Sequence, residues 1–164
     1  MAFRQLSELE NLLRQLVEEH GRMLAHVEAQ QMAMKSLKLD LMQESIHRQE
    51  ACRMRIMNLD TKRRILVQQI AKISKLNPNA TLPQLAVLYP QDGPKLMEAR
   101  DELKAVIRKI ADRTHVAGRL ASAVLGHLNT ALRLFAGAVG QAGTYTKHGV
   151  PRVTGRIGVM EAVG

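Results

Sequence analysis

Apolar residues recur at alternating intervals of three and four along the first part of the chain. This is the heptad spacing of helices that pack side by side. Positions 2–76 contain no proline and a single glycine, Gly21, so long helix is the expected structure there. The first series is apolar except at two positions, His20 and Gln30, and reads Leu6, Leu9, Leu13, Leu16, His20, Met23, Val27, Gln30, Met34, Leu37 and Leu41.

A second series does not continue the first, because five residues separate Leu41 from Ile46. Either one helix changes its buried face there, or the chain breaks and turns somewhere between Ala33 and Ser45. A turn would give an antiparallel hairpin, with helices over about 3–35 and 40–76. The second series reads Ile46, Gln49, Arg53, Ile56, Leu59, Arg63, Leu66, Ile70 and Ile73.

Proline and glycine mark the later boundaries. Asn77-Pro78-Asn79 ends the second helix, and a short helix is expected over 82–88. After a turn at 91–94, Pro94 suits the first position of a long helix over 94–139. The predicted fold class is all-α: an elongated antiparallel three-helix bundle or coiled coil over residues 1–140.

The last long helix has more apolar positions than one packed face needs. Its seam reads Leu96, Ala99, Leu103, Val106/Ile107, Ile110, Thr114, Ala117, Ala121, Val124, Leu128, Ala131 and Phe135. Beyond Val116, further leucines lie off this seam: Leu120, Leu125, Leu132 and Leu134. Two interpretations remain open. The surplus indicates either a wider core or homodimer seam, or a docking face for a partner helix.

Residues 141–164 differ in character from everything before them. They are rich in glycine, carry an excess of basic residues and contain one aromatic residue, Tyr145. Because so few of them are apolar, we expect a flexible tail that is disordered when free.

Composition narrows the class of protein. Hydrophobic residues make up 46% of the chain, yet there are two Phe, two Tyr and no Trp, which suits helix-on-helix packing. The single Cys52 excludes an internal disulfide framework and fits a reducing compartment. The segment from Met1 to Leu9 lacks the apolar core of a secretory signal. The most apolar stretch of the chain is too polar for a membrane-spanning helix, because it is interrupted by Arg119, His127 and Arg133. We therefore expect a cytoplasmic protein with no integral membrane segment.

No arrangement of residues indicates catalysis, a metal or a cofactor. The six histidines are not spaced as the ligands of a zinc site. No glycine-rich loop has the form of a phosphate-binding loop. No Ser or Cys lies in a recognisable motif of a catalytic nucleophile. The net charge of +9 is spread along the chain, which does not favour nucleic-acid binding.

Several elements together resemble the FlgN family of flagellar export chaperones. They are the leucine-rich helices, a long third helix with Gly118, the run from Asn129 to Phe135, and the Tyr145-x-x-x-Gly149 element after it. The order and spacing match over nearly the whole chain. One departure is that Thr114 and Ala117 precede Gly118, where the family often has two asparagines.

The resemblance implies a cytosolic chaperone of the flagellar type III export system. Such proteins bind the C-terminal helices of the hook-filament junction proteins FlgK and FlgL and deliver them to the export gate protein FlhA. Tyr145 would dock on the gate, with Gly149 shaping the following turn. By the same resemblance, the cargo-binding residues would be Leu120, Val124, Leu125, Leu128, Leu132 and Phe135.

Three other hypotheses are compatible with the sequence. The first is a structural coiled-coil protein that forms a homodimer through the surplus apolar stripe. The second is a basic helical protein that binds nucleic acid or an anionic membrane, whose affinity would fall steeply with salt. The third is another helical protein of the flagellar export apparatus.

Overall fold

A computed structural model describes residues 2–142 of the chain, and these residues form four helices without any strand. The helices are α1 (Ala2–Lys35), α2 (Leu39–Ile73), α3 (Leu82–Leu88) and α4 (Gly93–Ala142). The predicted all-α class is therefore confirmed. The chain divides into two compact units, 1–122 and 123–164, and the described part of the second unit is the last stretch of α4.

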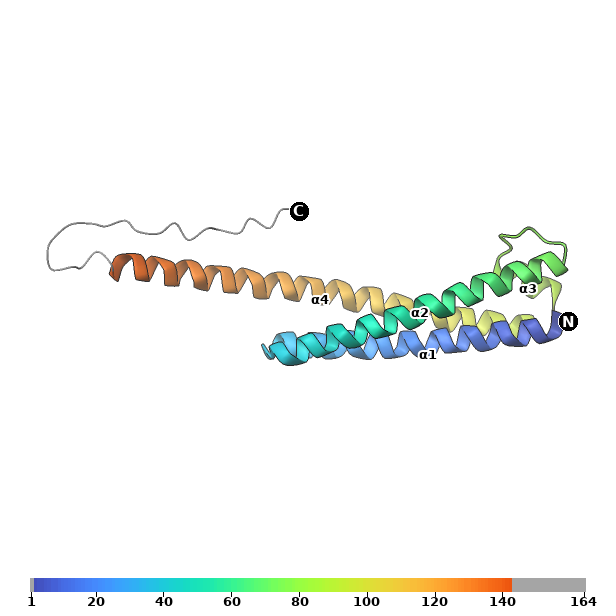
Figure 1. Ribbon diagram of the computed structural model, residues 1–164, viewed down its shortest axis with the longest axis horizontal. Coiled ribbons are helices and arrows are strands. Elements are labelled where there is room, and N and C mark those ends of the chain that lie inside the picture. Colours follow the sequence, from blue (N-terminus) through green and yellow to red (C-terminus); the bar gives the residue numbers. More distant parts are fainter. Residues whose placement is uncertain (1, 143–164) are drawn as a thin grey trace. The chain divides into compact units, whose positions relative to one another are not determined.

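Helices α1 and α2 lie side by side within the first unit (Figure 1). Their contacts pair residues in opposite order along the two helices. Glu19 of α1 accepts a hydrogen bond from Arg55 of α2 at 2.9 Å, whereas Gln30, further along α1, accepts one from the earlier Gln49 at 2.7 Å. The chain therefore turns back on itself between the two helices, and we call α1 and α2 together the hairpin.

The turn of the hairpin lies at residues 36–38 and is closed without glycine. Leu37 adopts a left-handed backbone conformation, with φ of 52°. The backbone N–H of Lys38 donates to the carbonyl of Ala33 at 3.0 Å, and that of Leu37 donates to Met34 at 3.1 Å. These two bonds form a Schellman motif, which satisfies the last carbonyl groups of α1. The chain thus breaks and turns here, and the seam of α1 does not extend to Leu41.

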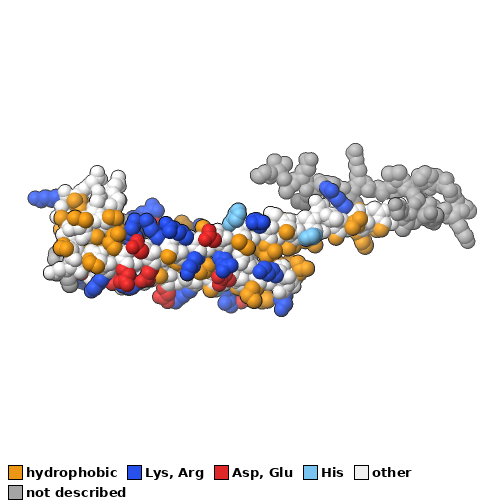
Figure 2. Space-filling view, turned by 180° about the vertical axis from the view of Figure 1, so that it is seen from behind, with side chains coloured by type: hydrophobic (Ala, Val, Ile, Leu, Met, Phe, Trp, Pro, Cys, Tyr) orange, Lys and Arg blue, Asp and Glu red, His pale blue; other side chains and the backbone are white. Residues whose placement is uncertain are grey.

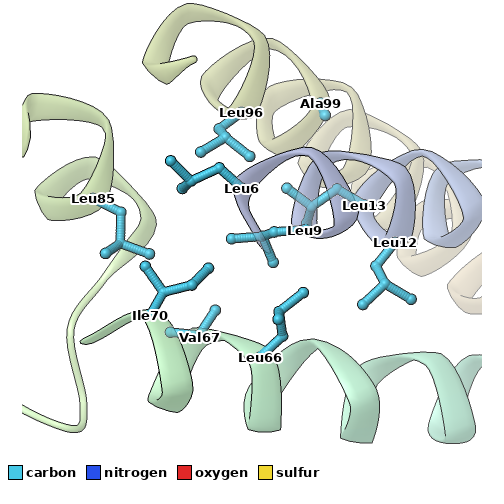
Figure 3. Close-up of a cluster of buried hydrophobic side chains, with 10 residues drawn as sticks. All are labelled: Leu6, Leu9, Leu12, Leu13, Leu66, Val67, Ile70, Leu85, Leu96 and Ala99. Carbon is cyan, nitrogen blue, oxygen red and sulfur yellow. The ribbon is translucent and has the colours of Figure 1, made fainter. Parts of the chain in front are cut away.

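Large aliphatic side chains fill the core at the base of the hairpin, where α1 begins and α2 ends. Leu6, Leu9 and Leu13 are almost completely buried. Figure 3 shows Leu9 facing α2 and Leu6 facing α4, with Leu85 of α3 closing the same cluster. The full cluster comprises Leu6, Leu9, Leu12, Leu13, Leu66, Val67, Ile70, Leu85, Leu96 and Ala99.

Towards its turn, the interior of the hairpin contains polar residues beside apolar ones such as Val27 and Ala33. Glu19 is buried and accepts hydrogen bonds from Arg22 at 2.8 Å and from Arg55 at 2.9 Å. Gln31 is also buried, and its side-chain amide donates to the backbone carbonyl of Arg113 in α4 at 2.6 Å. Because these buried polar groups need their particular partners, they fix which residues of the helices face one another.

A close approach of two backbones fixes the start of α4. A Cβ atom at Gly93 would lie 2.5 Å from the carbonyl oxygen of Ala86 in α3, so only glycine fits. The start of α3 is itself capped, since the backbone N–H of Thr81 donates to the side chain of Gln84 at 2.9 Å. Helix α4 therefore begins directly against α3 and contributes Leu96 to the core.

Replacing Leu9, whose side chain is 0% exposed, tests this core. We expect Leu9→Ala to lower the free energy of unfolding by about 2–5 kcal/mol, because the lost contacts leave a cavity. The measurement is chemical denaturation followed by circular dichroism. Leu134→Ala is the matched control: Leu134 is 72% exposed, so its truncation should have little effect. Equal losses in the two variants would show that the core is wrongly placed.

Candidate functional site

Burial changes sharply along α4. In the first unit, Leu96 and Ala99 are completely buried, and Ala117 is the last buried residue of the helix up to Gly140. The hairpin ends near this point, because Gln31 contacts Arg113 only four residues before α1 ends at Lys35. Helix α4 has 50 residues, against 34 in α1 and 35 in α2. From Leu125 to Gly140, every residue of α4 is exposed.

The second unit carries a row of apolar side chains on its stretch of α4, and all of them except the half-buried Val124 are exposed. We call Val124, Leu125, Leu128, Leu132, Phe135 and Val139 the α4 face. Their intervals of one, three and four residues place them on one side of a helix with 3.6 residues per turn. The exposed fractions are 66% for Leu125, 55% for Leu128, 67% for Leu132, 72% for Phe135 and 58% for Val139.

The predicted cargo-binding residues divide into two groups by exposure. Leu125, Leu128, Leu132 and Phe135 are exposed, whereas Val124 and Leu120 are half-buried. Leu120 belongs to the first unit and the other five belong to the second. The predicted gate-docking residues, Tyr145 and Gly149, lie outside the described residues.

A second group of exposed apolar side chains surrounds the turn of the hairpin. Met32, Leu37, Leu39 and Leu41 are all exposed. The heptad series predicted that Leu37 and Leu41 lie on the packed side of the helix, and this prediction was wrong. The seam ends with α1 at Lys35, so both residues lie beyond the part of the hairpin that packs. A glycine or proline at the turn would have revealed this, but neither is present.

The α4 face offers apolar contact and little other chemistry. One histidine, His127, and one arginine, Arg133, are the titratable residues of the second unit's described stretch. On the side seen in Figure 2, this stretch carries hydrophobic, basic and histidine side chains and no acidic one. Among residues 2–142, no group of three or more His, Cys, Asp or Glu side chains could hold a metal ion. Such a face can bind another apolar surface.

Comparison with known proteins decides the family. The sequence profile of the family described as "FlgN protein" matches residues 1–152. The chain belongs to the FlgN family. This FlgN-family chain is therefore a flagellar export chaperone, as its resemblance predicted. No curated protein and no solved structure matches it. In the part of the FlgN-family chain that the structure describes, no helix is both long and apolar enough to span a membrane.

The exposure of the α4 face has a direct consequence for stability. We expect the double substitution of Leu125→Ser and Leu132→Ser to change the free energy of unfolding by no more than about 0.5 kcal/mol per site, because neither side chain is packed. Chemical denaturation measures this, with Leu9→Ala as the destabilised reference. A loss comparable to that of Leu9→Ala would mean that the protein's own fold covers the face.

Proposed function

We propose that this FlgN-family chaperone acts in the cytoplasm, where it binds FlgK- or FlgL-like hook-filament junction proteins and delivers them to the export gate protein FlhA. The observation that carries the proposal is the exposed α4 face on a chain of this family. Exposed apolar clusters of this kind typically mark the binding site for another protein. A helix of the cargo would cover the cluster, in the manner of an amphipathic helix bound to an apolar surface.

The size of the face suits a reversible complex. Four exposed side chains, Leu125, Leu128, Leu132 and Phe135, would be buried on binding. At about 2 kcal/mol for each, the gross gain is roughly 8 kcal/mol. Loss of translational, rotational and side-chain freedom offsets much of this gain. The net affinity is then moderate, which allows a chaperone to release its cargo.

Delivery would use a different part of the chain. We assign gate docking to Tyr145, with Gly149 shaping the backbone after it. Two points support this assignment: the Tyr-x-x-x-Gly element is the most specific part of the resemblance, and the family profile extends through residue 152. Because Tyr145 follows the α4 face along the chain, cargo and gate could be held at the same time.

The first experiment places a charge in the middle of the α4 face. We expect Leu128→Asp to weaken cargo binding by several kcal/mol, because the complex would bury a carboxylate that has no partner. Isothermal titration calorimetry with a purified junction protein measures the effect. Thr130→Asp is the matched control, since Thr130 is exposed and lies almost opposite Leu128 around the helix. Unchanged affinity of Leu128→Asp would show that cargo binds elsewhere.

The second experiment separates cargo binding from delivery. We expect Tyr145→Ala to leave the affinity for cargo unchanged and to abolish recruitment of the complex to the cytoplasmic domain of the gate protein. A pull-down with that domain measures recruitment, and calorimetry measures cargo affinity. Thr146→Ala, at the neighbouring position, should affect neither. Equal loss of both activities in Tyr145→Ala would disprove this division of roles.

A further inference from the structure

We propose that the tip of the hairpin inserts into the surface of a membrane that contains anionic lipids. We define the tip as residues 32–42, which comprise the end of α1, the turn at 36–38 and the beginning of α2. This surface is distinct from the α4 face, and the proposal does not depend on cargo binding. It is supported by a leucine in an unfavourable backbone conformation, by apolar side chains on more than one side of the tip, and by the lysines among them.

The tip is rich in apolar residues although it lies at the end of the hairpin. Seven of its eleven residues are Met, Leu or Ala. The large side chains of Met32, Leu37, Leu39 and Leu41 are all exposed. Turns usually carry glycine or small polar residues instead. Clusters of exposed apolar side chains mark sites of contact with other proteins or with membranes.

Leu37 occupies a backbone position that favours glycine. Its φ of 52° lies in the left-handed region, where the Cβ atom of a side chain is crowded. Residues held in such conformations often lie at functional sites. Packing within the described chain does not compensate for the strain, because the Leu37 side chain is 65% exposed. A glycine would suit the turn better, so the leucine side chain indicates a contact outside the fold.

The end of α2 shows the opposite use of the same motif. Lys75 has the left-handed conformation there, and the next N–H, that of Leu76, donates to the carbonyl of Ala71 at 2.8 Å. Leu76 packs against the core, while the exposed left-handed residue is charged. At the tip this order is reversed, because the exposed Leu37 takes the left-handed position and Lys38 follows it. The turn of the hairpin therefore presents its apolar residue to the outside.

The apolar side chains of the tip do not form a single stripe. Leu39 and Leu41 are two residues apart in α2, so their side chains point about 200° away from each other around the helix. Both are exposed, and Met32 is exposed on α1. A partner helix would cover one side of the tip only. A bilayer surrounds an inserted tip on every side, so this arrangement favours lipid.

The charged residues of the tip suit anionic headgroups. Lys35 and Lys38 flank Leu37 and are exposed, and neither takes part in an ion pair among the described residues. Two lysines and one acidic residue, Asp40, give the tip a net charge of +1, and the whole chain carries +9. Lysine side chains can lie along an apolar surface while their ammonium groups stay in water, and basic residues attract anionic lipids.

Insertion would be shallow. Glu44 and Arg48 form an ion pair early in α2, and charged side chains are strongly disfavoured in the hydrocarbon region. The tip would therefore reach the layer of the headgroups and the first part of the acyl chains, as interfacial helices do. A few inserted leucines give weak and reversible binding.

Binding of the full chain to lipid vesicles tests the proposal. One set of vesicles contains phosphatidylcholine mixed with the anionic phosphatidylglycerol, and the other contains phosphatidylcholine alone. We expect the wild type to sediment with the anionic vesicles and to bind the neutral ones on the order of tenfold more weakly. Leu37→Gly and Leu39→Ser should each weaken binding to the anionic vesicles on the order of tenfold, because each removes one inserted leucine.

The variants separate membrane contact from stability. Leu37→Gly should leave the melting temperature unchanged or raise it, because glycine suits the left-handed turn. Circular dichroism measures this. The matched control is Val87→Ser, which removes an exposed apolar side chain of α3 far from the turn along the chain and should keep wild-type binding to vesicles.

A single tryptophan locates the contact, because the chain has none of its own. Anionic vesicles should shift the emission of Leu39→Trp to shorter wavelength and leave that of Val87→Trp unchanged. The proposal fails if the wild type binds neither set of vesicles, or if Leu37→Gly and Leu39→Ser bind as the wild type does. An equal shift in both tryptophan variants, or a wild-type dimer that Leu39→Ser dissociates in sedimentation, would also overturn it.

Discussion

The difference in length between the hairpin and α4 governs the rest of the structure. Helix α4 is anchored at its beginning, where Gly93 meets α3 and Leu96 enters the core. The hairpin turns back after Lys35, so the burial it provides along α4 stops at Ala117. A long helix gains most of its stability from packing one apolar side. The exposed apolar residues that follow Ala117 form the surface that we propose for cargo.

Periodicity carried most of the information about the fold. Intervals of three and four residues predicted helices and no strands, and the order of the elements pointed to the FlgN family. The position of the first turn could not be predicted, because its signal is usually a glycine in the left-handed conformation. Here Leu37 takes that conformation at the end of α1, and Lys75, with φ of 53°, takes it after α2. Neither leucine nor lysine is a residue type that predicts a turn from the sequence.

The exposure of the α4 face could not be predicted from any local sequence pattern. Leu128 continues the same seam as Leu96, yet Leu96 is completely buried and Leu128 is exposed. The cover that α1 and α2 give to α4 depends on where α1 ends and α2 begins, and that follows from the turn at residues 36–38. The same uncertainty explains why Leu41 was expected in the seam. The roles proposed for Tyr145 and Gly149 come from the resemblance to the family, since both residues lie outside the described part of the chain.

The two ends of the hairpin differ in what holds them together. Leucine and isoleucine fill its base, whereas Glu19, Gln31 and Ser45 are among the buried residues towards its turn. Buried amides and carboxylates contribute less net stability than the same volume of hydrocarbon, so backbone amides near the turn should exchange with deuterium sooner than those at the base. Local opening would then begin near the end of α1. The leucine core at the base would then be the last part of this chaperone to open.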